Sequence, residues 1–113
     1  MTTKNLRFAQ LSPARQALVR LLQTVNYGQI KVLFFRDGDP IFEPAPVVVV
    51  DAKLYRDDGP RPELGLADFE LSDHVRRLMA RLDNAESGMI QCIEVRAGLP
   101  RRVLLEAQLT ASP

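Results

Sequence analysis

Few residues of this chain have side chains that could act in catalysis or bind a metal ion. His74 is the only histidine and Cys92 the only cysteine. No serine or cysteine has the spacing of a catalytic nucleophile, and one histidine without cysteine or acidic neighbours makes no metal site. We therefore expect His74 to be a solvated residue in the first turn of a helix. Cys92 alternates with Ile90 on a predicted strand, which indicates a buried structural thiol.

Two short acidic stretches raise the question of cation binding. Asp37 and Asp39 flank a glycine, and Asp57 and Asp58 are adjacent. A calcium loop requires alternating oxygen ligands over about twelve residues and a closing glutamate, and neither stretch has them. The glycines do not lie between a strand and a following helix, as a phosphate-binding loop requires. The sequence therefore predicts no catalytic residue, no cofactor and no metal site, and we expect the protein not to be an enzyme.

Arginine is the residue type with the clearest functional potential, since it supplies 12 of the 15 basic side chains. The candidate nucleic-acid patch consists of Arg76, Arg77, Arg81, Arg101 and Arg102. Guanidinium groups match phosphate oxygens, so these residues would bind nucleic acid if they converge. The alternative is a solvated helix face with local ion pairs, such as Asp73 with Arg77. A net charge of only +1 favours that alternative, because nucleic-acid binders usually have a marked basic surface.

The length and composition of the chain favour one soluble domain, residues 1–113. A chain of this size forms one core, and 46% hydrophobic with 26% charged residues is typical of globular proteins. The first ten residues have no apolar stretch of signal-peptide length, and the longest apolar run, residues 46–50, is too short to cross a bilayer. With a single cysteine, these features favour a cytoplasmic protein without a membrane partner.

The first predicted element is a helix that begins at Ser12, which can cap it, with Pro13 at the first helical position. The apolar stripe expected to be buried is Ala14, Ala17, Leu18, Leu21, Leu22 and Val25. Polar residues Arg15, Gln16, Arg20 and Gln23 are expected on the other faces of the helix. Gly28 follows the last periodic position and predicts that the helix ends near Tyr27.

A strand is predicted from Gln29, because β-branched and aromatic residues follow. Asp37-Gly38 is the dipeptide preferred in two-residue hairpin turns, so a return strand should begin near Ile41. The prolines at 44 and 46 must bend that strand or confine it to a sheet edge. Residues 47–54 are expected to form a third strand.

The second half repeats this order. Residues 55–67 are predicted to be an exposed connector, and a second helix begins at Ser72. Its buried stripe is predicted to be Val75, Leu78, Met79, Leu82 and Ala85. Two strands, 89–96 and 101–106, should flank a turn at Ala97-Gly98, and residues 107–113 should form a frayed tail.

The two halves align without a gap at an offset of sixty residues. Nine of thirty aligned positions are identical, namely Leu11, Ser12, Leu18, Leu22, Gly28, Ile30, Arg36, Gly38 and Pro40 with their counterparts. A common register across helix, strand and turn favours an internal duplication of two αββ units, residues 11–54 and 68–106. Each unit has one apolar face that it cannot bury alone. We therefore predict an α+β fold with a mainly antiparallel sheet of four to five strands and both helices on one face.

The run from Leu18 to Gly38 resembles the small bacterial YezD-type proteins, which are single helix-hairpin units. The resemblance rests on the apolar helix, Tyr27-Gly28, the strand and the Asp37-Gly38 turn, over about the first third of the chain. This chain departs from the pattern at Asp39-Pro40 and at the proline-rich bend that interrupts the return strand, and its second half has Glu86-Ser87 in place of Asn26-Tyr27. The resemblance implies that one unit can pair with another, and it carries over no site residue.

The first half has more apolar side chains than two helices are expected to cover. The candidate interface consists of Phe34, Phe35, Ile41, Phe42 and Val48. An exposed apolar patch of this kind marks an interaction surface. We therefore expect a non-enzymatic protein-interaction or oligomerisation module that forms a homodimer or binds another protein. The alternatives are a nucleic-acid-associated regulatory protein and a small-ligand-binding protein with a pocket between helices and sheet.

Overall fold

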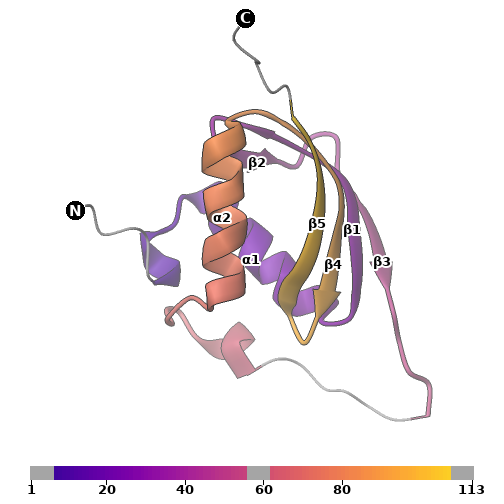
Figure 1. The fold of residues 1–113 in the computed structure, drawn as a ribbon. Coiled ribbons are helices and arrows are strands. Elements are labelled where there is room, and N and C mark those ends of the chain that lie inside the picture. Colours follow the sequence, from indigo (N-terminus) through magenta and orange to yellow (C-terminus); the bar gives the residue numbers. More distant parts are fainter. Residues whose placement is uncertain (1–6, 56–61, 108–113) are drawn as a thin grey trace, which may run out of the picture.

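The computed structural model describes residues 7–55 and 62–107, which form a five-stranded antiparallel sheet with two helices on one face (Figure 1). The helices are α1 (Pro13–Val25) and α2 (Asp73–Ala85), with short 3-10 turns η1 (Phe8–Gln10) and η2 (Pro62–Gly65). The strands are β1 (Gly28–Arg36), β2 (Asp39–Ile41), β3 (Val47–Val50), β4 (Gly88–Arg96) and β5 (Leu99–Ala107). The predicted α+β class and its antiparallel sheet are confirmed.

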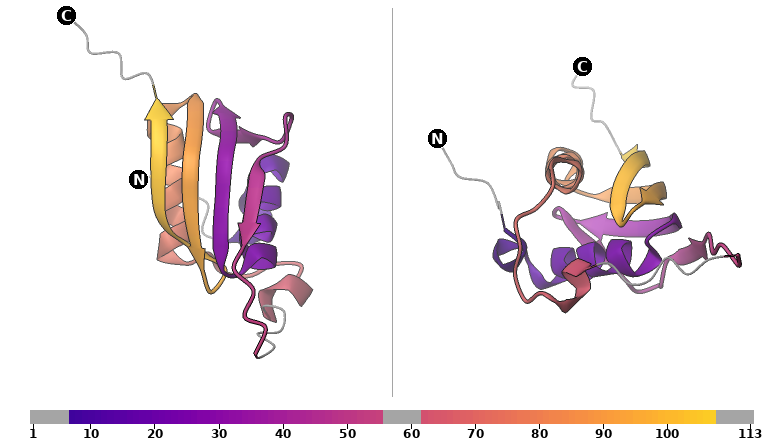
Figure 2. Two further views of the ribbon diagram at one scale, coloured as in Figure 1. Left: turned by 90° about the vertical axis from the view of Figure 1, so that its right-hand side faces the viewer. Right: turned by 90° about the horizontal axis from the view of Figure 1, so that it is seen from below.

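Strands β1 and β4 form the centre of the sheet, and β5 pairs with the outer side of β4. The opposite edge is shared, because β2 pairs with Phe34–Arg36 of β1 and β3 pairs with Gly28–Lys31. In the left view of Figure 2 both helices lie behind the sheet, and no helix lies in front of it. One sheet face is therefore covered, and the other is left open within the described part of the chain.

Both helices begin as the sequence predicts. The Ser12 hydroxyl accepts a hydrogen bond from the Arg15 amide at 3.2 Å, and Ser72 accepts one from the Val75 amide at 3.3 Å. Each side chain thereby satisfies one of the amides that a first helical turn leaves without an intrahelical partner. The predicted stripe of α2 is confirmed from Val75 to Leu82, and Ala85 packs half-buried against the core.

The stripe of α1 was predicted in part, because Leu18, Leu22 and Val25 are buried as expected but three further residues face the core. Arg15 is buried, with 8% of its surface exposed, and Val19 and Gln23 face inward, whereas Ala17 is exposed. Arg15 can be buried because its guanidinium is paired: Nε donates to the Gly38 carbonyl at 2.9 Å, and Nη2 donates to the Asp83 carboxylate. This ion pair joins α1 to α2. The buried face of α1 therefore contains a charged side chain, although helix periodicity predicts only apolar residues there.

The central strands face the helices with residues at matching positions. Ile30, Leu33 and Phe35 of β1 are buried, as are the residues sixty positions later, Ile90, Ile93 and Val95. In a regular strand one residue separates neighbours on the same face, but two residues lie between Ile30 and Leu33 and between Ile90 and Ile93. Both strands are irregular there. Val32 has φ 59°, and the β4–β5 register shifts between Ile90 and Cys92. Cys92 consequently lies half-buried on the face opposite Ile90, which corrects the prediction of a buried thiol.

The edge formed by β2 and β3 is interrupted, as the prolines predict. Residues 42–46 leave the ladder between the two short strands, whereas β5 runs for nine residues beside β4. Strand β3 ends at Val50, so the prediction that it reaches residue 54 is wrong. Beyond Val50 the chain bends away, and the Asp51 amide donates to the Tyr27 carbonyl at 2.7 Å.

Equivalent elements of the two halves are spaced equally. The bounds of α1 and α2, and of β1 and β4, differ by sixty residues. The hairpin turns match as well, since Asp37 and Gly38 have φ 52° and 78°, and Ala97 and Gly98 have φ 53° and 74°. This spacing is what an internal duplication requires, and the duplication itself stays a prediction.

The ends and the connector contain structure that sequence patterns did not indicate. Phe8 of η1 stacks on Phe69 with ring centroids 4.8 Å apart, and the Arg20 guanidinium lies 4.3 Å from the Phe8 ring centroid. The predicted connector contains η2, and residues 56–61 lie outside the described part of the chain. The predicted tail begins inside β5, and its residues 108–113 also lie outside. Within the described residues neither helix is long and apolar enough to cross a membrane.

Candidate functional site

The acidic residues considered for cation binding have structural roles where they are described. Asp39 accepts a hydrogen bond from the Ser12 hydroxyl at 2.7 Å and lies 3.6 Å from Nε of Arg15. Asp37 is an exposed turn residue whose amide donates to Ser87 at 3.1 Å. Asp57 and Asp58 lie outside the described residues. In residues 7–55 and 62–107 no three histidine, cysteine or acidic side chains gather where they could hold a metal ion.

The open face of the sheet is a surface that the described residues leave without a covering layer. We define it by three cross-strand rows whose members are paired in register and face away from the helices: Val49–Gln29–Glu94–Arg102, Val47–Lys31–Cys92–Leu104 and Ile41–Phe34–Met89–Glu106. None of these twelve side chains is buried. Seven are apolar, and the four charged ones are two bases and two acids, so the face is mainly apolar and has a balanced charge.

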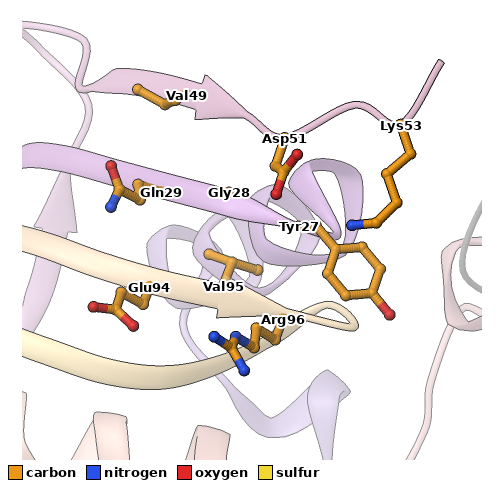
Figure 3. A pocket seen from close by; sticks show the side chains of 9 residues that line it. All are labelled: Tyr27, Gly28, Gln29, Val49, Asp51, Lys53, Glu94, Val95 and Arg96. Atoms are coloured by element: carbon orange, nitrogen blue, oxygen red, sulfur yellow. The ribbon is translucent and has the colours of Figure 1, made fainter.

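A cleft of about 450 Å³ lies at one end of this face (Figure 3). Tyr27, Asp51 and Lys53 line one side, and Glu94 and Arg96 of β4 line the other. Lys53 Nζ lies 5.5 Å from the Tyr27 ring centroid, within reach of a cation–π contact. Because Gln29, Val49 and Glu94 belong to both the cleft and the open face, the cleft is the polar end of that face.

Gly28 allows β1 and the edge strand β3 to approach closely at this end of the sheet. Its φ is 154°, and a Cβ atom at this position would lie 2.0 Å from the Val49 carbonyl oxygen. No side chain can occupy that space without moving backbone. The sequence indicated Gly28 only as a helix terminator, so this close approach of β1 and β3 was not predicted.

A second groove, of about 320 Å³, lies between α2 and β5 and contains most of the predicted arginine patch. Its lining residues are His74, Arg77, Leu78, Arg81, Pro100, Arg101, Arg102 and Val103. Arg76 does not line the groove, because its guanidinium donates to Asp73 at 2.9 Å. The predicted pair of Asp73 with Arg77 is therefore replaced by a pair with the neighbouring arginine. His74 is half-buried at the rim of this groove.

The residues of the predicted interface do not all share one surface. Phe34 and Ile41 lie on the open face, whereas the exposed Val48 lies on the helix side of β3. Phe35 is 2% exposed and belongs to the core, and Phe42 packs half-buried against the core. Consecutive strand residues alternate between faces, so Phe34 and Phe35 could not both be exposed.

Among the described residues, one small cavity lies where a ligand pocket between helices and sheet was predicted. A cavity lined by α1, the start of α2 and the Ala97-Gly98 turn has a volume of about 80 Å³. Ligand pockets are usually in the range of about 300–1,000 Å³. The two surface depressions described above are the larger sites.

Comparisons of the chain with models of protein families, with curated proteins and with solved structures find no match. The geometry of the open face and of the arginine groove is therefore the basis for a functional proposal.

Proposed function

We propose that this protein is a non-enzymatic interaction module that pairs with a second copy of itself through the open face of its sheet. The observation that carries the proposal is the set of exposed apolar side chains that β1, β3 and β5 contribute to that face, with Phe34, Val47, Val49 and Leu104 each more than a third exposed. Exposed apolar side chains gathered on one face are typical of interaction sites.

Charge favours a second copy as the occupant. The open face has two basic residues, Lys31 and Arg102, and two acidic residues, Glu94 and Glu106. Two such faces related by a twofold axis can therefore place acids against bases. A strongly basic or acidic partner would gain nothing from this balance. Two open faces would form a sandwich with the sheets about 10 Å apart.

The size of the open face sets the expected affinity. Four strands spaced by about 4.8 Å and rows extending over about six residues at 3.3 Å give roughly 20 Å by 20 Å, on the order of 400 Å² per copy. Two such faces would bury about 800 Å² together, which is below the roughly 1,200–2,000 Å² of standard specific interfaces and in the range of weak, transient pairs. The pair is therefore expected to be reversible, with dissociation at micromolar concentrations.

Two neighbouring valines provide the decisive test. Val49 lies on the open face and Val48 on the helix side of the same strand, and their exposed fractions are 41% and 40%. In sedimentation velocity at concentrations well above the micromolar range, the wild type and Val48→Lys should show twice the chain mass, and Val49→Lys should be monomeric. Leu104→Lys should also be monomeric, and Leu66→Lys, which alters a leucine of similar exposure away from the sheet, should not.

Two results would contradict the proposal. A wild-type chain that stays monomeric up to the highest soluble concentration has no such pairing. Equal loss of dimer in Val48→Lys and Val49→Lys would indicate pairing through the free edge of β3, because edge pairing does not distinguish the two faces. Circular dichroism of each variant would establish that the fold is retained.

A further inference from the structure

The groove between α2 and β5 gathers three arginine side chains that have no hydrogen-bond or ion-pair partner among the described residues. Ten of the twelve arginines are in the described residues, and Arg7, Arg15, Arg20, Arg76 and Arg102 have hydrogen bonds or ion pairs there. Of the five described arginines without such a partner, Arg77, Arg81 and Arg101 line this groove. No carboxylate is among the lining residues. Three unpaired guanidinium groups therefore share one depression about 320 Å³ in volume.

Packing does not require these arginines. The helix positions sixty residues earlier, which occupy the same places on α1, are Ala14 for His74, Ala17 for Arg77 and Leu21 for Arg81. The same helix-on-strand arrangement is thus formed with small or apolar side chains in the first half. Gathering like charges costs free energy unless an anion is bound, so the cationic groove is better explained by a ligand than by the fold.

The lining residues also indicate what kind of anion fits. A guanidinium group donates two parallel hydrogen bonds to a phosphate, and the imidazole of His74 adds a further donor at the rim. The groove floor is aliphatic, with Leu78 and Pro100 buried, and no aromatic ring lines it on which a nucleobase could stack. The recognised group is therefore a phosphate, not a base.

We propose that the groove between α2 and β5 binds the phosphate group of a phosphate ester through Arg77, Arg81 and Arg101. The ester can belong to a small phosphorylated molecule or to a nucleic-acid backbone, which share this chemistry. The three arginines lie on the helix side of the sheet, and Arg102 is the one lining residue that also belongs to the open face, so the proposal does not rest on the self-association proposed above.

The test uses two probes on the full chain. Binding of inorganic pyrophosphate is followed by amide chemical shifts, and binding of a fluorescein-labelled oligodeoxythymidylate by anisotropy, both at low and moderate salt. The variant is Arg77→Gln/Arg101→Gln. Its matched control is Arg36→Gln/Arg96→Gln, which removes the same charge from two exposed arginines at the ends of β1 and β4.

The expected result is binding of at least one probe that weakens tenfold or more in the groove variant and less than twofold in the control. Pyrophosphate binding identifies a small phosphorylated ligand as sufficient. Binding of the oligonucleotide alone, with a steep salt dependence, identifies a nucleic-acid backbone. Failure of both probes at low salt, or equal weakening in the two double variants, overturns the proposal. Val49→Lys should bind the probes as the wild type does, which separates this site from the open face.

Discussion

Gly38 and Glu86 are joined across the two halves of the chain, because the Gly38 amide donates to the Glu86 carbonyl at 2.7 Å. The reciprocal bond runs from the Gly98 amide to the Asn26 carbonyl at 2.9 Å. Each hairpin turn is thereby tied to the end of the opposite helix. The two bonds are equivalent to each other, as they would be if a twofold axis between β1 and β4 related the two halves.

Replacing Gly38 with alanine should destabilise the protein. The residue has φ 78°, and a Cβ would lie 2.6 Å from Nη2 of Arg15 and 3.1 Å from the Asp83 carboxylate. We expect a loss of about 1–3 kcal/mol in the free energy of unfolding, measured in urea, from backbone strain and displacement of that ion pair. Gly65→Ala is the control, since a Cβ there meets nothing within 4 Å. Equal stability of the two variants would contradict this description of the turn.

Arg15 and Asp83 should show coupled effects on stability. In a double-mutant cycle of Arg15→Met and Asp83→Asn, we expect a coupling free energy of about 1 kcal/mol, because the guanidinium is buried and the carboxylate only half exposed. The exposed pair of Asp73 with Arg76 serves as comparison, and Asp73→Asn should cost less than about 0.5 kcal/mol. Additive effects of the two core substitutions would mean that the ion pair contributes nothing.

Gly28→Ala should displace β3 from the sheet. The added methyl group overlaps the Val49 carbonyl oxygen, so either strand must move, and we expect a loss of about 3 kcal/mol, at the upper end of ordinary substitutions. Hydrogen exchange should accelerate in the amides that join β1 and β3 and stay slow between β1 and β4. Unchanged exchange in residues 47–50 would show that the strands can separate slightly at no cost.

The pair of Arg7 with Asp68 should give a measurable pH dependence. The Arg7 guanidinium, which donates to Asp68 at 2.7 Å, and the Ala9 amide, at 2.9 Å, hold the pKa of that carboxyl below its usual range. Because the pKa is lower in the folded state, the stabilisation is present above the unfolded value of about 3.9 and disappears as the pH falls through the folded value. Carboxyl titration by NMR should show the pKa rising in Arg7→Gln and unchanged in Arg36→Gln. No difference between the variants would exclude the pair in solution.

The sequence predicted the elements well where local chemistry decides them. Ser12 and Ser72 cap helices and the glycines at 38 and 98 sit in hairpin turns, because these functions depend on a few neighbouring atoms. The burial of Arg15 could not be predicted, since its partner Asp83 is sixty-eight residues away and becomes a neighbour only in the folded chain. Helix periodicity alone assigned this polar residue to the surface.

The candidate sites were predicted only in part, because they too depend on contacts that form only in the folded chain. Strand alternation could have separated Phe34 from Phe35, but the irregularity near Val32 and Gln91 changes the faces and reversed the placement of Cys92. The arginines of α2 and β5 were identified as a group. Which of these arginines lack an ion-pair partner depends on which side chains pair in the folded chain. Asp73 pairs with Arg76, for example, and sequence spacing alone does not determine that choice.

The central pairing of β1 with β4 has a consequence for how quickly the chain folds. Its register joins Gly28 with Val95, so a loop of more than sixty residues must close before the core can form. The hairpin of β4 and β5 closes only a two-residue turn and can form within microseconds. The slow step is then the docking of one half on the other, and its rate is limited by the entropy of loop closure.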